Sequence, residues 1–186
     1  MKQRPETAEE LFASFAARYK FVESTPTAST AWYLAKADRV ALDRADSWPI
    51  VLEARRCGRQ IDDIWWFVNT PERYPECVPM LVRHLDEPHR IMTMDALVRA
   101  LTVDYARGIA TQPLLRLLRR EFEQPLPHPE AFSPGAIQMH RAAIAASLAM
   151  NADRSIVPEV EELLKDLRYE WVKSELKRAL RIGKKH

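Results

Sequence analysis

The sequence predicts an all-α fold built from helix pairs that repeat along the chain. Only four glycines occur in 186 residues, too few for the many tight turns of a sheet protein. Apolar residues recur at intervals of three and four, which is the spacing of one helix face. The string VPMLVRHL, which begins at Val78, returns as a degenerate copy, VPEVEELL, at Val157. These three observations together predict helices arranged in repeated groups.

Length and composition indicate one soluble domain, residues 1–186, with 47% apolar and 29% charged residues. No apolar run reaches 18 residues, and MKQRPETAEELF lacks the apolar stretch of a signal peptide, so we expect a cytoplasmic protein without a membrane partner. A net charge of +2 is too small to imply a nucleic-acid partner by itself. Arginines outnumber lysines 20 to 8, which favours interfaces because guanidinium groups suit planar, bidentate contacts.

Residues 1–46 are predicted to form two N-terminal capping helices. Thr7 and Glu10 make a capping box for the first helix. The polar stretch ESTPTAST ends that helix, and Ser29 or Thr30 is expected to cap the next, which runs to about Ala45. The first helix carries one apolar stripe, made of Ala8, Leu11, Phe12, Phe15 and Tyr19.

Residues 47–186 are predicted to hold the helix pairs. Ser47 supplies an N-cap before WPIVLEARRCG, and Gly58 stands where a helix end favours positive φ. A short helix follows in IDDIWWFVNT, in which Trp66 and Phe67 lie off the predicted stripe and either meet a neighbouring helix or stay exposed for a partner. Its buried stripe is predicted to be Ile61, Ile64, Trp65 and Val68.

The repeat itself spans two clear helix pairs at an offset of 79 residues. The tripeptide RAL closes each of them, at Arg99 and again at Arg178. Between them QPLLRLLRREF and IQMHRAAIAASLAM form a middle pair, interrupted by a proline-rich loop at 123–135, so the offset corresponds to two units of about 40 residues. The predicted stripes of the first helices are Cys77, Val78, Leu81, Val82 and Leu85, and Ile156, Val157, Val160, Leu163, Leu164 and Leu167.

From about residue 47 to its end the chain resembles the HEAT-repeat family. The aliphatic stripes and the early prolines Pro79, Pro113 and Pro158 carry this resemblance, although the usual Asp and Val-Arg signature between the helices is blurred to DEPHRIM and DLRYEWV. The resemblance implies a short HEAT or armadillo-like solenoid of stacked antiparallel helix pairs with one concave face.

A partner-binding face is predicted on the second helix of each pair. In the first pair Ile91, Met94, Leu97, Val98 and Leu101 define the core arc, so Met92, Ala96 and Arg99 are expected to point the other way. The corresponding residues elsewhere are Trp171, Glu175 and Arg178 in the last pair, and Met139, Ala142 and Ala146 beside His140 and Arg141 in the middle pair. The predicted partner-binding residues are Met92, Asp95, Arg99, His140, Arg141, Trp171, Glu175 and Arg178.

Structural roles compete for some of these residues. Asp95 and Arg99 lie four apart, which also suits an intrahelical ion pair, and Trp171 suits packing between helices. No catalytic residue, cofactor or metal is expected. His84 and His89 lie five apart, which does not place both on one helical face as a zinc HExxH motif does. Cys57 and Cys77 are each predicted to be buried free thiols.

The leading functional hypothesis is a non-enzymatic protein-binding module. Chains with segments such as YPECVPMLVRHL and ALVRALTV are similar to bacterial HEAT-like proteins that include immunity proteins of contact-dependent toxins, which implies a toxin domain as the partner. The alternative is a DNA-binding protein related to the HEAT-like alkylpurine DNA glycosylases, because six Arg and only two Asp fall between Arg90 and Arg120. A scaffold or chaperone subunit is a third reading, and it differs from the first only in its partner.

Overall fold

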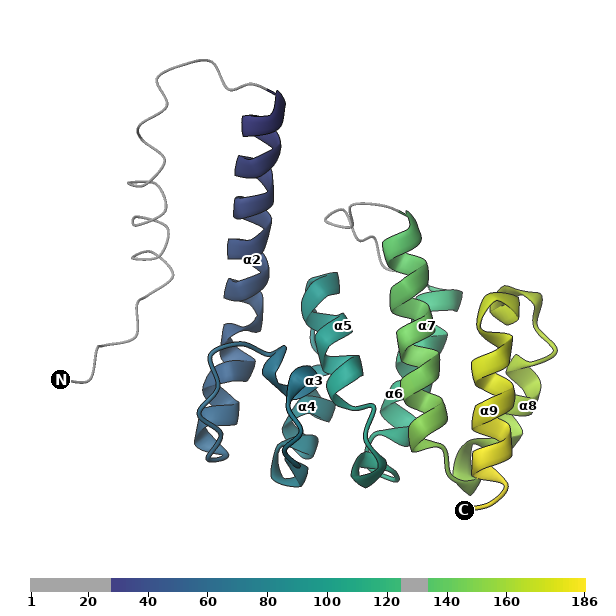
Figure 1. The fold of residues 1–186 in the computed structure, drawn as a ribbon. Coiled ribbons are helices and arrows are strands. Elements are labelled where there is room, and N and C mark those ends of the chain that lie inside the picture. The colour runs from purple at the N-terminus through teal and green to yellow at the C-terminus, as the bar shows by residue number, and fades with distance from the viewer. Residues whose placement is uncertain (1–27, 125–133) are drawn as a thin grey trace. The chain divides into compact units, whose positions relative to one another are not determined.

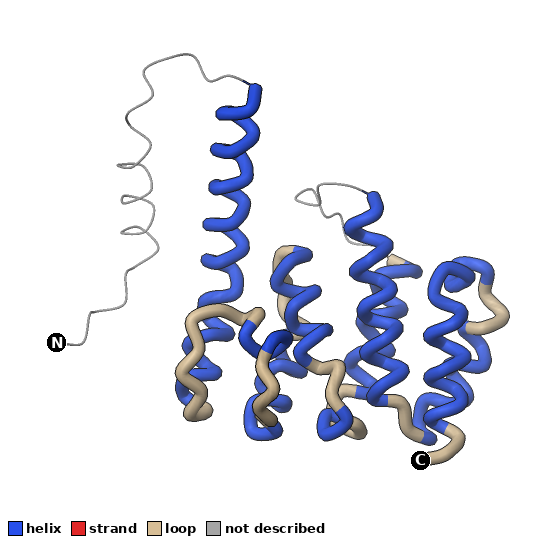
Figure 2. Tube along the Cα trace, viewed as in Figure 1, coloured by secondary structure: helices blue, strands red, loops and turns tan. Residues whose placement is uncertain are grey.

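The computed structural model describes residues 28–124 and 134–186, and in these ranges helices joined by turns and loops make up the chain, with no strand (Figures 1 and 2). The all-α prediction is therefore confirmed for the described residues. The capping box and first helix predicted between Thr7 and Tyr19, and most of the proline-rich loop, lie outside them. The α-helices are α2 (Ala28–Arg56), α3 (Trp66–Asn69), α4 (Val78–His84), α5 (Ile91–Ala100), α6 (Thr111–Glu123), α7 (Pro134–Asn151), α8 (Val157–Leu163) and α9 (Lys173–Gly183).

The contacts within the chain divide it into two units, residues 1–46 and 47–186. Helix α2 runs through this boundary without interruption. The sequence predicted that one helix ends near Ala45 and that Ser47 caps a new one. This predicted break is wrong, because one helix covers both segments. Pro49 lies inside α2 and donates no amide hydrogen bond, but Ile50, Val51 and Ala54 in the same part of the helix are all buried. Their burial in the second unit offsets the hydrogen bond lost at the proline.

The end of α2 follows the sequence prediction. Gly58 has a φ of 90°, a conformation that glycine adopts without a steric penalty. Its amide donates to the carbonyl of Arg55 at 3.1 Å, and the amide of Arg59 donates to Ala54 at 3.0 Å. This is the Schellman arrangement, which satisfies carbonyl groups left without partners at a helix C-terminus.

The stretch after α2 packs by its aromatic rings. Phe67 is 2% exposed and lies edge-on to Tyr74, with ring centroids 4.8 Å apart. Trp66 is half-buried against both rings. Val68, which was predicted to lie in the buried stripe, is only half-buried. Of the two alternatives for Trp66 and Phe67, packing within the protein is the one that the structure shows, and the predicted stripe is wrong at Val68, because a helix of only four residues is oriented by its aromatic neighbours and not by its own periodicity.

Three helix pairs follow, α4 with α5, α6 with α7, and α8 with α9. Helix α5 also packs against α7, and α7 against α9, so the three second helices lie side by side (Figure 1). The first helix of each pair has proline as its second or third residue, at Pro79, Pro113 and Pro158, where the missing amide hydrogen costs little. A short 3₁₀ helix lies before each, namely η1 (Pro75–Cys77), η2 (Asp104–Ala106) and η3 (Arg154–Ile156).

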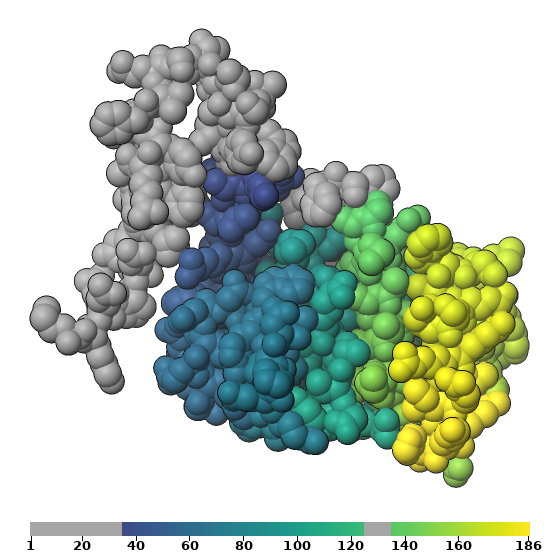
Figure 3. Space-filling view, in the orientation of Figure 1, coloured from purple at the N-terminus to yellow at the C-terminus, as the bar shows by residue number. Residues whose placement is uncertain are grey.

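One continuous apolar core runs through the second unit, from Ile50 to Ala179. Side chains fill the spaces between the neighbouring ribbons of this unit (Figure 3). The core arc predicted for α5 is confirmed, since Ile91, Met94, Leu97, Val98 and Leu101 are all buried. The first helices bear out most of their predicted stripes: Val78, Leu81, Val160 and Leu163 are buried.

Three further burial predictions are wrong. Ala96, expected opposite the core, is fully buried because α5 has packed neighbours both in its own pair and in α7. Leu167, expected to continue the stripe of α8, is 84% exposed because that helix ends at Leu163, and Leu167 begins the 3₁₀ helix η4 (Leu167–Val172). Cys57 is exposed, whereas Cys77 is buried as predicted, and both are free thiols.

Buried polar groups join the helix pairs at the C-terminal end of α5. The Tyr74 hydroxyl donates to the carbonyl of Ala100 at 2.7 Å, and the Asn151 amide donates to the carbonyl of Leu101 at 2.6 Å. The Thr111 hydroxyl lies 2.7 Å from the carbonyl of Asn151. These bonds satisfy terminal carbonyls that would otherwise be buried without a donor, and they link α5, α6 and α7 at one end.

Candidate functional site

Large apolar side chains are exposed near the N-terminal ends of the second helices. Met92 is the second residue of α5 and is 36% exposed, and Met139 in α7 is 61% exposed. Trp171, in η4 just before α9, is 63% exposed. The N-terminal ends of α5, α7 and α9 lie on the same side of the unit (Figure 1). Exposed apolar groups gathered near one another on a surface mark binding sites more often than scattered ones do.

A hollow of about 390 Å³ lies between the first turns of α5 and α7. Two of its lining residues, Met92 and Met139, are the exposed methionines just described. Its volume falls within the range of ligand pockets in proteins. The residues that line it are Ile91, Met92, Asp95, Gly135, Ala136, Met139 and His140.

A charged network forms one side of this hollow. The Arg99 side chain donates to a carboxylate oxygen of Asp95 at 2.7 Å, and His140 Nδ1 lies 3.5 Å from the other oxygen. Burial alone would raise the pKa of Asp95, but the hydrogen bonds from His140 and Arg99 outweigh it and hold the pKa below its ordinary value. The carboxylate is therefore ionised and already engaged within the protein.

The eight predicted partner-binding residues fall into separate environments. Met92, Asp95 and His140 meet at the hollow, and Arg99 touches it only through Asp95. His140 is 1% exposed, so its side chain forms part of the floor of the hollow and has almost no surface open to solvent. The intrahelical alternative for Arg99 is the geometry that the structure shows.

Arg141 packs inward against the first helix of its own pair. Its guanidinium carbon lies 4.8 Å from the ring centroid of Phe122 in α6, a cation–π contact. Phe122 in turn stacks on Tyr169, whose hydroxyl donates to Glu123 at 3.0 Å. Arg141 therefore helps to hold α6, α7 and η4 together.

The three predicted residues of the last pair do not line the hollow. Trp171 and Arg178 are exposed, and Glu175 is half-buried and accepts a 2.6 Å hydrogen bond from Ser174. Of this group only Trp171 is a large exposed apolar side chain. The structure adds Ile91, Gly135 and Ala136 to the hollow. Helical periodicity assigns Ile91 to the core, and the other two, at the end of the proline-rich loop and directly after it, belong to no recognisable motif.

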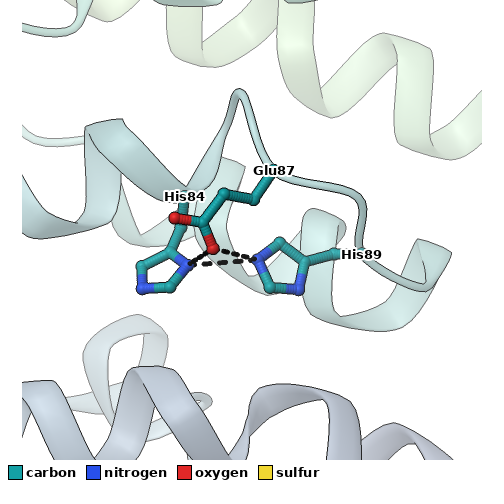
Figure 4. A group of neighbouring side chains, drawn as sticks. All are labelled: His84, Glu87 and His89. Atoms are coloured by element: carbon teal, nitrogen blue, oxygen red, sulfur yellow. Dashed lines mark hydrogen bonds and ion pairs between the residues drawn. The ribbon is translucent and has the colours of Figure 1, made fainter.

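A second cluster lies at the turn between α4 and α5 (Figure 4). His84 Nδ1 lies 2.8 Å from Glu87 Oε2 and 3.2 Å from His89 Nε2, while Glu87 Oε2 and His89 Nε2 are 3.9 Å apart. Helix α4 ends at His84, and the following turn brings His89 back to it. The spacing rule applied to the sequence assumed one continuous helix, and for that reason it missed this cluster.

Searches of protein-family models, curated proteins and solved structures found no match for this chain. None of the described helices combines the length and hydropathy that crossing a bilayer requires.

Proposed function

We propose that the chain is a non-enzymatic protein-binding module, and that it grips an apolar, acidic helix or loop of another protein at the N-terminal ends of α5, α7 and α9. The observation that carries the proposal is the hollow of about 390 Å³ flanked by the exposed Met92 and Met139. Methionine side chains are flexible and polarisable, and they are common at surfaces that receive an apolar segment of a partner.

The acidic character of the partner follows from the helix ends. Neither α5 nor α7 has an acidic residue in its first turn, whereas α9 has Glu175, so the positive dipole ends of α5 and α7 are the ones that no side chain of their own first turns neutralises. The Asp95 carboxylate beside them is already paired with Arg99. A segment that carries carboxylates beside its apolar residues would therefore complement both features of this surface.

The side-by-side second helices and the early prolines support the more specific form of the proposal, a HEAT-like stack of helix pairs. If the chain is a HEAT-like stack, its resemblance to immunity proteins implies that the partner is a toxin domain.

Several of the arginines that motivated the DNA-binding alternative form ion pairs with carboxylates of the same chain. Arg99 pairs with Asp95, Arg116 with Asp86 and Arg119 with Glu159. These pairings weaken the case for a continuous basic stripe on this part of the chain.

The test compares Met139→Glu with a matched control, Ile109→Glu. Both residues are exposed apolar side chains, but Ile109 lies outside the hollow in the turn before α6. The partner is first isolated from the native host and identified, and its binding to the purified chain is then measured by calorimetry. We expect Met139→Glu to weaken binding by about 2 kcal/mol, roughly 30-fold, and Ile109→Glu to leave it unchanged.

Circular dichroism on both variants checks that folding is retained. Equal affinity in the two variants would exclude the hollow as the binding surface. Recovery of nucleic acid in place of a protein would favour the DNA-binding alternative.

A further inference from the structure

The cluster of His84, Glu87 and His89 has the ligand types and the spacing of a zinc site. Two imidazole nitrogens and one carboxylate oxygen converge on a single point (Figure 4). Imidazole with carboxylate is a common ligand set for zinc with three protein ligands and one open position. We propose that these three residues bind one Zn²⁺ through His84 Nδ1, Glu87 Oε2 and His89 Nε2, with solvent as the fourth ligand.

The distances between the ligand atoms carry the proposal. Zinc bonds to nitrogen and oxygen are about 2.0–2.1 Å long, so the ligands of a tetrahedral site are about 3.3 Å from one another. The three separations here are 2.8, 3.2 and 3.9 Å, which bracket that value. Binding would therefore need only small side-chain adjustments and no movement of the backbone.

The environment of His84 supplies a second, independent observation. Its side chain is 2% exposed, and its Nε2 is buried with no hydrogen-bond partner. A carboxylate oxygen of Glu53, in α2, lies 3.6 Å from this nitrogen. If Nδ1 carries the ring proton and donates to Glu87, the lone pair of Nε2 faces that anion.

Zinc on Nδ1 would resolve this unfavourable arrangement. The ring proton then resides on Nε2 and points toward Glu53, which becomes the outer carboxylate that metal-binding histidines usually have. Arg83 forms an ion pair with Glu53, and it also lies 3.8 Å from Glu87 Oε1, which leaves Oε2 turned toward the two histidines.

The site has a route to solvent. The Glu87 side chain is 44% exposed, while the side chains of His84 and His89 are 2% and 6% exposed. An ion would thus approach from the Glu87 side, and a solvent ligand would occupy that open side. Bound zinc would fasten the turn that leads into Ile91, the first residue of α5 and part of the hollow.

The test is calorimetric titration of the untagged full chain with Zn²⁺. We expect one ion per chain, with affinity reduced more than about 100-fold in His89→Ala and in Glu87→Gln, and about 10- to 100-fold in Glu53→Gln. The matched control is His186→Ala, which removes an exposed imidazole outside the cluster and should not change the affinity. Thermal melting with and without Zn²⁺ should show a higher midpoint with the ion in the wild type and not in His89→Ala.

Substitution by Co²⁺ identifies the ligands without any measure of partner binding. We expect the visible absorption of tetrahedral cobalt with nitrogen and oxygen ligands, and no thiolate charge-transfer band. The proposal is overturned if the chain binds no zinc, if His89→Ala and Glu87→Gln bind it as the wild type does, or if Cys57→Ser abolishes binding.

Discussion

At the scale of single residues, the Asp95 carboxylate links two helices. Arg99 on its own helix and His140 on α7 both face it, and together they lower its pKa. A carboxylate whose pKa is lowered by folding stabilises the protein above the ordinary pKa of aspartate, and this contribution is lost as the pH falls through the lowered value. The contribution of Asp95 to stability should therefore disappear in acid.

We expect Asp95→Asn to reduce the free energy of unfolding by about 1–3 kcal/mol at neutral pH, because hydrogen bonds to a charged group are lost. The difference from the wild type should shrink toward zero below the ordinary pKa of aspartate. Urea unfolding at a series of pH values measures it. Asp104→Asn, at an exposed position, serves as the control and should have little effect at any pH. A loss that did not vary with pH would contradict the assigned role of the charge.

At the scale of elements, the end of α9 approaches the start of the same helix pair very closely. A Cβ atom added at Gly183 would lie 2.7 Å from the carbonyl oxygen of Asp153 and 3.0 Å from a methyl carbon of Val157. The first of these neighbours is backbone and cannot rotate away. The close packing of α9 against η3 and α8 thus depends on the absence of a side chain at this position.

Gly183→Ala should therefore destabilise the protein by about 1–3 kcal/mol, although alanine is the better helix former. Thermal or urea unfolding measures the loss. Lys185→Ala, two residues farther along and exposed, should change stability by less than about 0.5 kcal/mol. A more stable Gly183→Ala variant would show that α9 is free to shift away from Asp153.

Apolar periodicity correctly predicts which residues are buried in helices that bury one apolar face. The arc from Ile91 to Leu101 is buried as expected, and so are most of the stripes in the first helices. It fails where contacts with other segments determine which residues are buried. Ala96 is covered by packing between the second helices, and Phe67 is buried by the rings around it. His84 and His89 meet because a turn reverses the chain, and their spacing in the sequence does not encode that turn.

The candidate binding site was only partly predictable for the same reason. Met92, Asp95 and His140 were predicted from equivalent positions in successive helices, and they do meet at the hollow. The same reasoning placed Trp171, Glu175 and Arg178 with them, yet these residues lie outside it. Equivalence along a repeat identifies the side of a helix but does not give the lateral distance between neighbouring helices.

At the scale of the whole molecule, the continuous core predicts that the second unit unfolds as one. Leu176 in α9 is fully buried, and Cys77, just before α4, belongs to the same core. We expect Leu176→Ala to reduce the free energy of unfolding by about 2–5 kcal/mol. Chemical labelling of Cys77 should become faster by the factor that corresponds to this loss of stability. Labelling under native conditions followed by mass spectrometry measures this rate. An unchanged Cys77 rate would mean that α9 opens independently of α4.

The two thiols interact with each other but differ in exposure, and this difference has a practical consequence. Burial raises the pKa of Cys77 to about 12, so this thiol resists alkylation while the protein stays folded, whereas Cys57 is accessible from the start. A fluorophore could thus be attached selectively at Cys57. Cys77 would react only in molecules that have opened, so its slow labelling would report the rate of opening.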